Sequence, residues 1–166
     1  YFREQAECTQ KYVIPYIEQV LCIKSNLRVL EIGCGEGGNL KPFLDVGCHC
    51  VGIDIDVAQL EKAKAFFANH SLNKNLLLIA NDIYKVSPNE IGNFDLIILR
   101  DVIEHLPNQE LFMHQLKCFM HSESVVFFGF PVWCNPFGGH QQICRSKWLS
   151  HTPWLHLLPK RLYKKV

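Results

Sequence analysis

The sequence predicts an α/β protein built on a doubly wound parallel sheet. Segments typical of strands and of helices alternate along residues 28–130. The predicted strands are short and apolar throughout, as expected of strands buried between two layers of helices. Several strands run directly into glycines or acidic residues. Because ligands of such sheets bind beyond the carboxyl ends of the strands, these residues are the first candidates for a functional site.

The first half of the chain supplies two strands and three helices. An amphipathic stretch over residues 3–22 predicts a helix, which Pro15 would kink or restart. A β-branched run at 28–32 predicts the first strand, and 50–53 predicts the second. The helices between and after them are expected at 40–46, with Pro42 in the first turn, and at 57–69.

The second half continues the alternation and then changes character. Strands are predicted at 76–80, 94–99 and 124–130, and a helix at 108–120. Residues 131–166 are rich in proline, glycine, tryptophan and histidine, and they give no convincing further pair of strands.

Length and composition indicate one globular domain over residues 1–166, with 48% hydrophobic and 20% charged residues. The net charge of +1 gives no electrostatic argument for a nucleic acid or an anionic membrane as partner. No run of about 18 apolar residues is present to span a membrane. Residues 1–5 contain an acid and no apolar core, so they are not expected to be a secretion signal. A start at Tyr1 suggests a piece trimmed from a longer chain.

The eight cysteines are scattered and form no CxxC pair. Free thiols in a reducing cytoplasm are therefore expected rather than a disulfide framework. The motif Cys48-His49-Cys50 has no second ligand pair nearby, so no metal site is predicted there.

The loop after the first strand is rich in glycine, which allows tight turns and close approach of a ligand to the backbone. It satisfies two patterns at once. Gly33, Gly35 and Gly38 fit GxGxxG of dinucleotide sites. Glu31, Gly33, Gly35 and Gly37 fit ExGxGxG of S-adenosylmethionine (SAM) methyltransferases.

Acidic residues follow the later strands as well. Asp54 ends the second strand, where a carboxylate can accept hydrogen bonds from both hydroxyls of a ribose. Asp82 follows the third strand, where it can accept from an adenine amine, and Asp101 follows the fourth. With Glu31 of the first strand, these acids at four strand ends of one sheet together predict a nucleoside-containing ligand.

At this point the sequence resembles the class I SAM-dependent methyltransferases, in particular the group that includes ubiquinone-pathway O-methyltransferases and uncharacterised bacterial relatives. The resemblance covers about residues 28–130 and rests on VLEIGCGEGGN (29–39), VGIDID (51–56), NDI (81–83) and FDLIILRDVIEHLPN (94–108). It implies a Rossmann-like core over 24–130 and a substrate-side region over 131–166. Family sheets continue with a sixth and a seventh strand, which we expect to be missing or truncated here.

The resemblance also implies roles for individual residues, with SAM as cofactor and S-adenosylhomocysteine as product. Glu31 and the loop over 33–38 would lie against the methionine portion. Asp54 would hold the ribose hydroxyls, and Ile55 would pack on adenine. Asp82 and Ile83 would hold the adenine edge, and the backbone carbonyl of Arg100 would accept from the methionine amine. The cofactor-binding residues are thus expected to be Glu31, Gly33, Cys34, Gly35, Gly37, Asp54, Ile55, Asp82, Ile83 and Arg100.

The predicted activity is in-line transfer of a methyl group to an oxygen or nitrogen of a small molecule. A hydroxyl acceptor needs a base, and the pKa of an ordinary histidine, about 6.5, suits that task. His105 and His140 are therefore the candidate catalytic residues. The motif NPPY of amino-methylating enzymes is absent, which argues against nucleic acid bases and glutamine as acceptors. The sequence gives no prediction of the acceptor's identity or of the oligomeric state.

Three alternatives stay open. The chain could bind SAM without catalysis, or it could be a fragment of an NAD-binding oxidoreductase. Asp101, Glu104 and His105 would share one face if their segment is helical, and with His140 they could hold a divalent metal. That set is similar to the ExxEH pattern of metal-assisted 2′-O-methyltransferases of RNA 3′ ends, although the first position is Asp.

Overall fold

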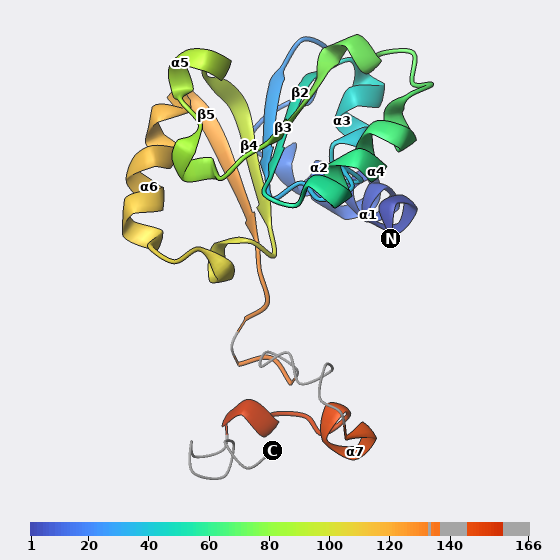
Figure 1. The fold of residues 1–166 in the computed structure, drawn as a ribbon, viewed down its shortest axis with the longest axis vertical. Helices are drawn as coiled ribbons and strands as arrows, with labels where there is room; N and C mark the ends of the chain where they lie inside the picture. The colour runs from blue at the N-terminus through green and yellow to red at the C-terminus, as the bar shows by residue number, and fades with distance from the viewer. Residues whose placement is uncertain (133, 137–145, 158–166) are drawn as a thin grey trace. The chain divides into compact units, whose positions relative to one another are not determined.

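A computed structural model describes residues 1–132, 134–136 and 146–157, and it divides the chain into two compact units, Tyr1–Gly129 and Phe130–Val166 (Figure 1). His140 and residues 158–166 lie outside the described residues. Each unit is considered separately, and the prediction of one domain over residues 1–166 stays a prediction.

The first unit contains one five-stranded sheet in which all paired strands are parallel. The strand order is β3-β2-β1-β4-β5. The strands are β1 (Arg28–Ile32), β2 (His49–Asp54), β3 (Leu76–Ala80), β4 (Phe94–Arg100) and β5 (Met120–Gly129). The predicted doubly wound sheet is confirmed, and within the described residues no sixth or seventh strand follows β5.

Helices cover both faces of the sheet and give it two hydrophobic cores. On one face lie α1 (Phe2–Cys8), α2 (Ile14–Ile17), α3 (Lys41–Val46) and α4 (Val57–Phe67). On the other face lie α5 (Pro88–Ile91) and α6 (Gln109–Cys118). The central strands β1 and β4 contribute to both cores, which explains why their sequences are apolar almost throughout.

The N-terminal helical segment is shorter than predicted and is interrupted. Between α1 and α2 the chain widens into one π-helical turn, Thr9–Val13, and the helix ends at Ile17 rather than at residue 22. Pro15 has no N–H to donate, which accounts for the irregular turn before it. Val20, one of the apolar positions behind the prediction, is exposed, so the buried stripe ends with Ile17.

Strand β5 begins at Met120, four residues earlier than expected. Its pairing with β4 is irregular, because Phe94 pairs with Met120 and Leu96 already pairs with Val125. The bulge takes up His121, Ser122 and Glu123, which are exposed and polar and so concealed the strand in the sequence.

The second unit contains two short helical segments among its described residues, α7 (Lys147–Ser150) and a 3-10 helix, Leu155–Leu157. The backbone N–H of Trp154 donates to the Pro136 carbonyl at 2.6 Å, and its indole N–H donates to the Cys134 carbonyl at 3.2 Å. Across the described parts of both units, every helix is too short or too polar to cross a bilayer.

Candidate cofactor-binding site

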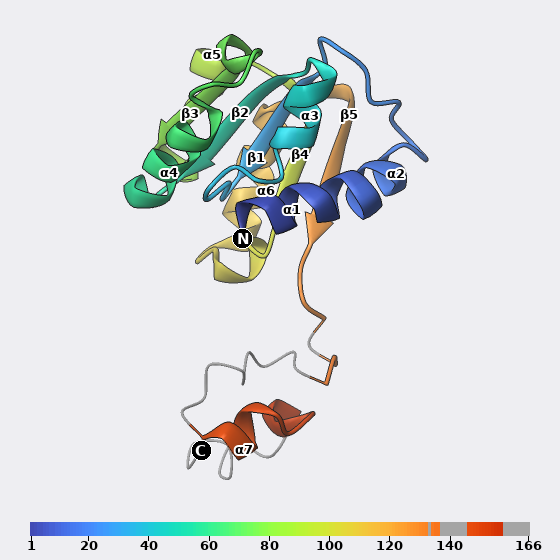
Figure 2. The ribbon, with the colours of Figure 1, turned by 90° about the vertical axis from the view of Figure 1, so that its right-hand side faces the viewer.

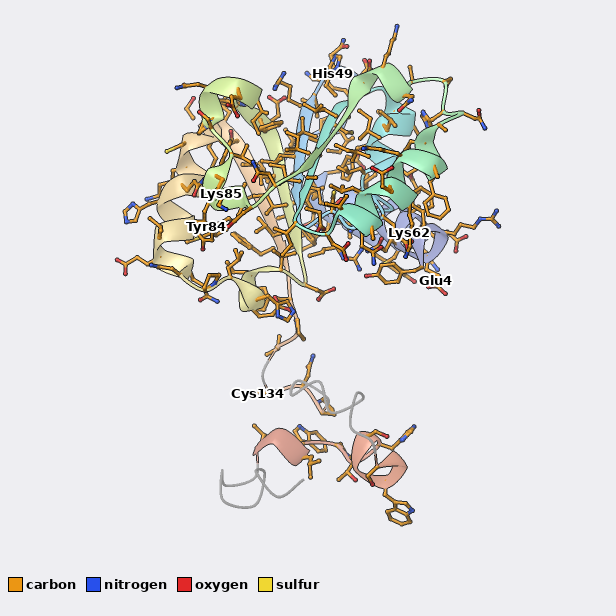
Figure 3. All side chains as sticks on the ribbon, viewed as in Figure 1. Glu4, His49, Lys62, Tyr84, Lys85 and Cys134 are labelled. Atoms are coloured by element: carbon orange, nitrogen blue, oxygen red, sulfur yellow. The ribbon has the colours of Figure 1, made fainter. Side chains whose placement is uncertain are left out.

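A cleft of about 450 Å³ opens at the carboxyl ends of β1, β2, β3 and β4, where the parallel sheet was expected to bind its ligand. Its volume falls within the range of small-molecule sites. The lining residues are Ile32, Gly33, Ile53, Asp54, Ile55, Asn81, Asp82, Tyr84, Asp101, Val102, His105, Leu106 and Pro107. His49 of the Cys-His-Cys motif starts β2 and therefore lies at the amino ends of the strands, away from the cleft. Figure 3 shows His49 far from Tyr84, which lines the cleft.

The glycine loop is fixed to the strand beside it. The N–H groups of Gly33 and Cys34 both donate to the Ile53 carbonyl, at 2.8 and 3.1 Å. Gly33 has φ +72°, and an added Cβ would lie 2.3 Å from Val102. Gly35 has φ +50° but would meet nothing within 4 Å. The first glycine is therefore required by packing, whereas the second keeps open space beside the loop.

Asp54 connects the glycine loop to the end of β2. Its Oδ2 accepts from the Gly35 N–H at 2.7 Å, and its Oδ1 accepts from the Asp56 N–H at 2.8 Å. A carboxylate has about four acceptor positions, so two hydrogen bonds leave capacity for a ligand's hydroxyls. Asp54 also lines the cleft, and its contact with a ribose stays a prediction.

The residues expected around an adenine ring divide into two groups. Ile55 lines the cleft with 76% of its surface exposed, and Asp82 lines it as well. Asp82 also caps the short 3-10 helix at 83–85 by accepting from the Tyr84 N–H at 3.0 Å. Ile83, in contrast, does not line the cleft, and its side chain is buried in the core under α6.

Glu31, Cys34 and Arg100 lie behind the cleft rather than on its surface. Glu31 is 1% exposed and accepts from the Asn39 amide at 2.6 Å. The Arg100 guanidinium donates to the Asn39 side-chain oxygen at 2.8 Å. Sequence reasoning assigned Arg100 only a backbone role, and it assigned no role to Asn39.

Burial dominates the titration of the two groups behind the cleft. It raises the pKa of the Glu31 carboxyl from 4.5 to about 8, and the Asn39 hydrogen bond and the Arg100 charge offset only part of this. Burial likewise raises the pKa of the Cys34 thiol well above its usual range, and the Glu31 and Asp54 charges add to the effect. Cys34 is thus an inert packing residue at neutral pH.

The segment after β4 forms the remaining wall. His105 lines the cleft and belongs to a 3-10 helix, Ile103–His105. Asp101 lies outside that helix with φ +55°, so Asp101, Glu104 and His105 do not share one face of an α-helix as the metal hypothesis required. Among the described residues no group of three or more histidine, cysteine, aspartate or glutamate side chains could hold a metal ion. His140, the other candidate base, lies outside the described residues.

Comparison with known proteins now gives the family. A family model described as "Methyltransferase domain" matches residues 2–154, which is most of the chain. The chain belongs to this methyltransferase family. The fold anticipated from the resemblance to class I methyltransferases is the one observed, and the family match argues against the NAD-dependent alternative.

Curated relatives of this methyltransferase domain include the ubiquinone biosynthesis O-methyltransferase of Bartonella tribocorum. The two are 25% identical over 125 residues, which is 69% of this chain and 49% of that protein. A sterol 4-C-methyltransferase of Caenorhabditis elegans is 28% identical over 61% of this chain and 30% of its own length. The chain therefore spans about half the length of the ubiquinone relatives that it matches.

Solved structures show the same fold for the methyltransferase domain. PKMT2 from Rickettsia typhi in complex with AdoHcy has a TM-score of 0.65 at 23% identity, covering 81% of this chain and 27% of its own. Coclaurine N-methyltransferase bound to N-methylheliamine and SAH has a TM-score of 0.63 at 20% identity, covering 74% of this chain and 35% of its own.

Several cleft residues of the methyltransferase domain were not singled out from the sequence. Asn81 was part of a quoted motif but received no role, and Tyr84 was not considered. Both follow β3 directly, so the rule that ligands bind at strand ends could have identified them. Val102, Leu106 and Pro107 are apolar wall residues that no chemical motif marks.

Proposed function

We propose that this chain binds SAM in the cleft and transfers its methyl group to an oxygen or nitrogen atom of a small-molecule acceptor. The observation that carries the proposal is the gathering of Asp54, Ile55 and Asp82 around one 450 Å³ cleft beside the glycine loop. The family match supports the same chemistry.

The residues present fit the cofactor's three parts. Asp54 keeps acceptor capacity for two ribose hydroxyls, and the exposed Ile55 side chain offers an apolar surface for a purine. Asp82 can accept from an exocyclic amine with the carboxylate positions left after its bond to Tyr84. Gly35 leaves open space beside the loop. Glu31 Oε2 is buried and accepts no hydrogen bond from the described residues, so it would be the acceptor for an ammonium group that reaches it.

When bound, SAM supplies an electrophilic methyl on a sulfonium, whose sulfur leaves uncharged. Little new charge then needs stabilising, and the protein's task is to align the acceptor with the methyl and to exclude water. Such positioning contributes up to about 7–11 kcal/mol. Val102, Leu106 and Pro107 provide the apolar wall that excludes water. His105, in the same wall, is proposed to take the proton of a hydroxyl acceptor, and His140 is kept as a second candidate base.

Small-molecule acceptors are favoured by the relatives, whose names refer to ubiquinone biosynthesis, a sterol and coclaurine. The described cysteines are all free thiols, which supports a cytoplasmic site for the reaction as part of the proposal.

The first test is binding of S-adenosylhomocysteine by calorimetry, with Asp54→Ala as the disrupting variant. We expect the wild type to bind and Asp54→Ala to lose at least tenfold in affinity, because a carboxylate paired with hydroxyls contributes about 1.5–3 kcal/mol per charged hydrogen bond. Asp95→Ala is the matched control. Asp95 also accepts from a backbone N–H, that of Arg28 at 2.7 Å, but at the opposite edge of the sheet.

Incubation with methyl-labelled SAM and a metabolite extract then tests for turnover. Label appearing in a small molecule supports the proposed enzyme. Tight binding with no labelled product in any extract would favour a SAM-binding module without catalysis. Equal affinity of Asp54→Ala and the wild type would remove Asp54 from the site.

A further inference from the structure

A buried polar network joins the N-terminal helical segment to the residues behind the cleft. The Thr9 hydroxyl donates to the Asn39 side-chain oxygen at 2.8 Å, and the Asn39 amide donates to Glu31 Oε1 at 2.6 Å. Arg100 donates to the same Asn39 oxygen at 2.8 Å and approaches the Thr9 hydroxyl at 3.4 Å. The four residues come from the π-helical turn, the end of the glycine loop, β1 and β4.

Three of the network's four residues are almost completely withdrawn from water, and Arg100 is half-buried. Thr9, Glu31 and Asn39 are 0%, 1% and 2% exposed. Each polar group there must find its partner inside the protein. Loss of the Thr9 hydroxyl would leave the Asn39 oxygen with Arg100 as its remaining donor among the described residues. The network therefore fixes the Asn39 amide in one orientation, with its oxygen toward Thr9 and Arg100 and its N–H toward Glu31.

The same helical segment presses directly on the glycine loop. A Cβ added at Gly38 would lie 2.6 Å from the Phe2 carbonyl oxygen and 2.7 Å from Gln5 Cβ, so only glycine allows this approach. Phe2 stacks on Phe66 of α4 with 4.3 Å between ring centroids. Figure 2 shows α1 and α2 lying across the sheet near the carboxyl ends of the strands, where the cleft opens. The helical segment thus supports the glycine loop on the side away from the cleft.

One atom of the network has no partner among the described residues. Glu31 Oε2 is buried and accepts no hydrogen bond from them. An oxygen of this kind is matched by a donor with positive charge, such as the ammonium of an amino-acid portion of a ligand. The π-helical turn that carries Thr9 is the kind of helix irregularity found frequently at functional sites.

We propose that Thr9 is a positioning residue of the cofactor site: through Asn39 it orients Glu31 and the glycine loop, so that docking of residues 2–17 and binding of the cofactor strengthen each other. This inference rests on the proposed function. Thr9 does not line the cleft, and it acts on the ligand only through Asn39 and Glu31.

The first experiment measures S-adenosylhomocysteine affinity by calorimetry in three variants of the full chain. Thr9→Val keeps the side-chain shape and removes the donor, whereas Thr9→Ser keeps the hydroxyl. Tyr12→Phe removes an exposed hydroxyl from the same turn and is the matched control. We expect Thr9→Val to bind about tenfold more weakly, the factor that corresponds to one hydrogen bond of ordinary strength. Thr9→Ser and Tyr12→Phe should bind within twofold of the wild type.

The main measurement of the second experiment uses the wild type, so it does not depend on the folding of a variant. Coupling between two events is reciprocal, so the ligand must stabilise the helical segment by as much as the segment strengthens binding. Hydrogen exchange of the wild-type amides over residues 2–17 should therefore slow about tenfold when S-adenosylhomocysteine is saturating. In Thr9→Val this ligand-induced slowing should be lost, which a purely structural role of Thr9 would not cause.

The outcomes separate this inference from the proposed function. If the folded wild type shows no binding of S-adenosylhomocysteine, the proposed function is overturned and this inference with it. If the wild type binds but Thr9→Val binds equally well, or the ligand leaves exchange over residues 2–17 unchanged, the cofactor site stands and the role of Thr9 is refuted.

Discussion

The Glu31 carboxyl lies in surroundings that favour its neutral form. It is nearly inaccessible to water, and one of its oxygens has no hydrogen-bond partner in the part of the chain that the structure describes. Burial raises its pKa from 4.5 to about 8. In the unfolded chain the same group ionises near its ordinary pKa. Between these two values the folded state holds a proton that the unfolded state has released, so stability falls as the pH rises through this window.

Glu31→Gln should remove this pH dependence, because the amide has the shape of the protonated acid and does not titrate. The wild type should lose a few kcal/mol of unfolding free energy between about pH 5 and pH 8, since each unit of pKa shift corresponds to 1.36 kcal/mol. The variant should change much less and be the more stable protein at pH 8. Urea denaturation at several pH values measures both slopes.

An exposed acid provides the control for that comparison. Glu110 lies on the surface in the first turn of α6, so Glu110→Gln removes one charge without changing a buried group. Its stability should follow the wild-type pH profile. Parallel losses in Glu31→Gln and in the wild type would mean that Glu31 is not the group responsible.

Two neighbouring glycines should tolerate alanine very differently. At Gly33 a methyl group would collide with Val102 at 2.3 Å and the backbone has φ +72°, whereas at Gly35 only the strain of φ +50° remains. Gly33→Ala should therefore cost roughly 3 kcal/mol or more of unfolding free energy, and Gly35→Ala about 1–2 kcal/mol.

Denaturant midpoints of the two glycine variants, measured side by side, check the difference in stability. Gly35→Ala should nevertheless weaken binding of S-adenosylhomocysteine, because its methyl group occupies the open space beside the loop. A Gly33→Ala protein as stable as Gly35→Ala would contradict the packing argument.

At the scale of elements, the sequence predicted what short-range patterns determine. The central strands are continuous apolar runs bounded by glycine or acid, so β1 to β4 were predicted within about one residue of their observed bounds. Their carboxyl ends carry Asp54 and Asp82, and a parallel sheet brings such ends to one edge. The position of the cleft was therefore predictable before any coordinate was known.

Elements whose form depends on distant contacts were predicted less well. The bulge in β5 requires pairing with β4, and the end of the N-terminal helix requires knowledge of which apolar side chains find a partner. The buried network shows the same limit, since Arg100 is 91 residues from Thr9 and Asn39 is 30 residues from it. No local pattern marks a threonine that meets an asparagine across such a separation.

At the scale of the whole chain, the proposed cofactor residues and His105 belong to one unit, whereas the second candidate base, His140, belongs to the other. Every proposed cofactor residue, from Glu31 to Arg100, belongs to Tyr1–Gly129. The described residues of both hydrophobic cores also belong to this unit, because they all lie between Phe2 and Phe128. His140 and the expected substrate-side region belong to the second unit.

A chain ending at Gly129 should accordingly keep the cofactor site and lose methyl transfer. We expect it to fold cooperatively and to bind S-adenosylhomocysteine within about threefold of the full chain, because every proposed cofactor residue is retained. The ligand at 100 Kd should then raise its stability by about 2.7 kcal/mol. Thermal unfolding with and without the ligand measures the stabilisation, and labelled SAM with the acceptor found for the full chain measures methyl transfer.

The full chain carrying Asp54→Ala is the control for lost binding with residues 130–166 intact. A shortened chain that folds but no longer binds would show that the second unit helps to build the cofactor site. One that still transfers methyl groups would show that residues 1–129 suffice for the reaction and would exclude His140 as its base.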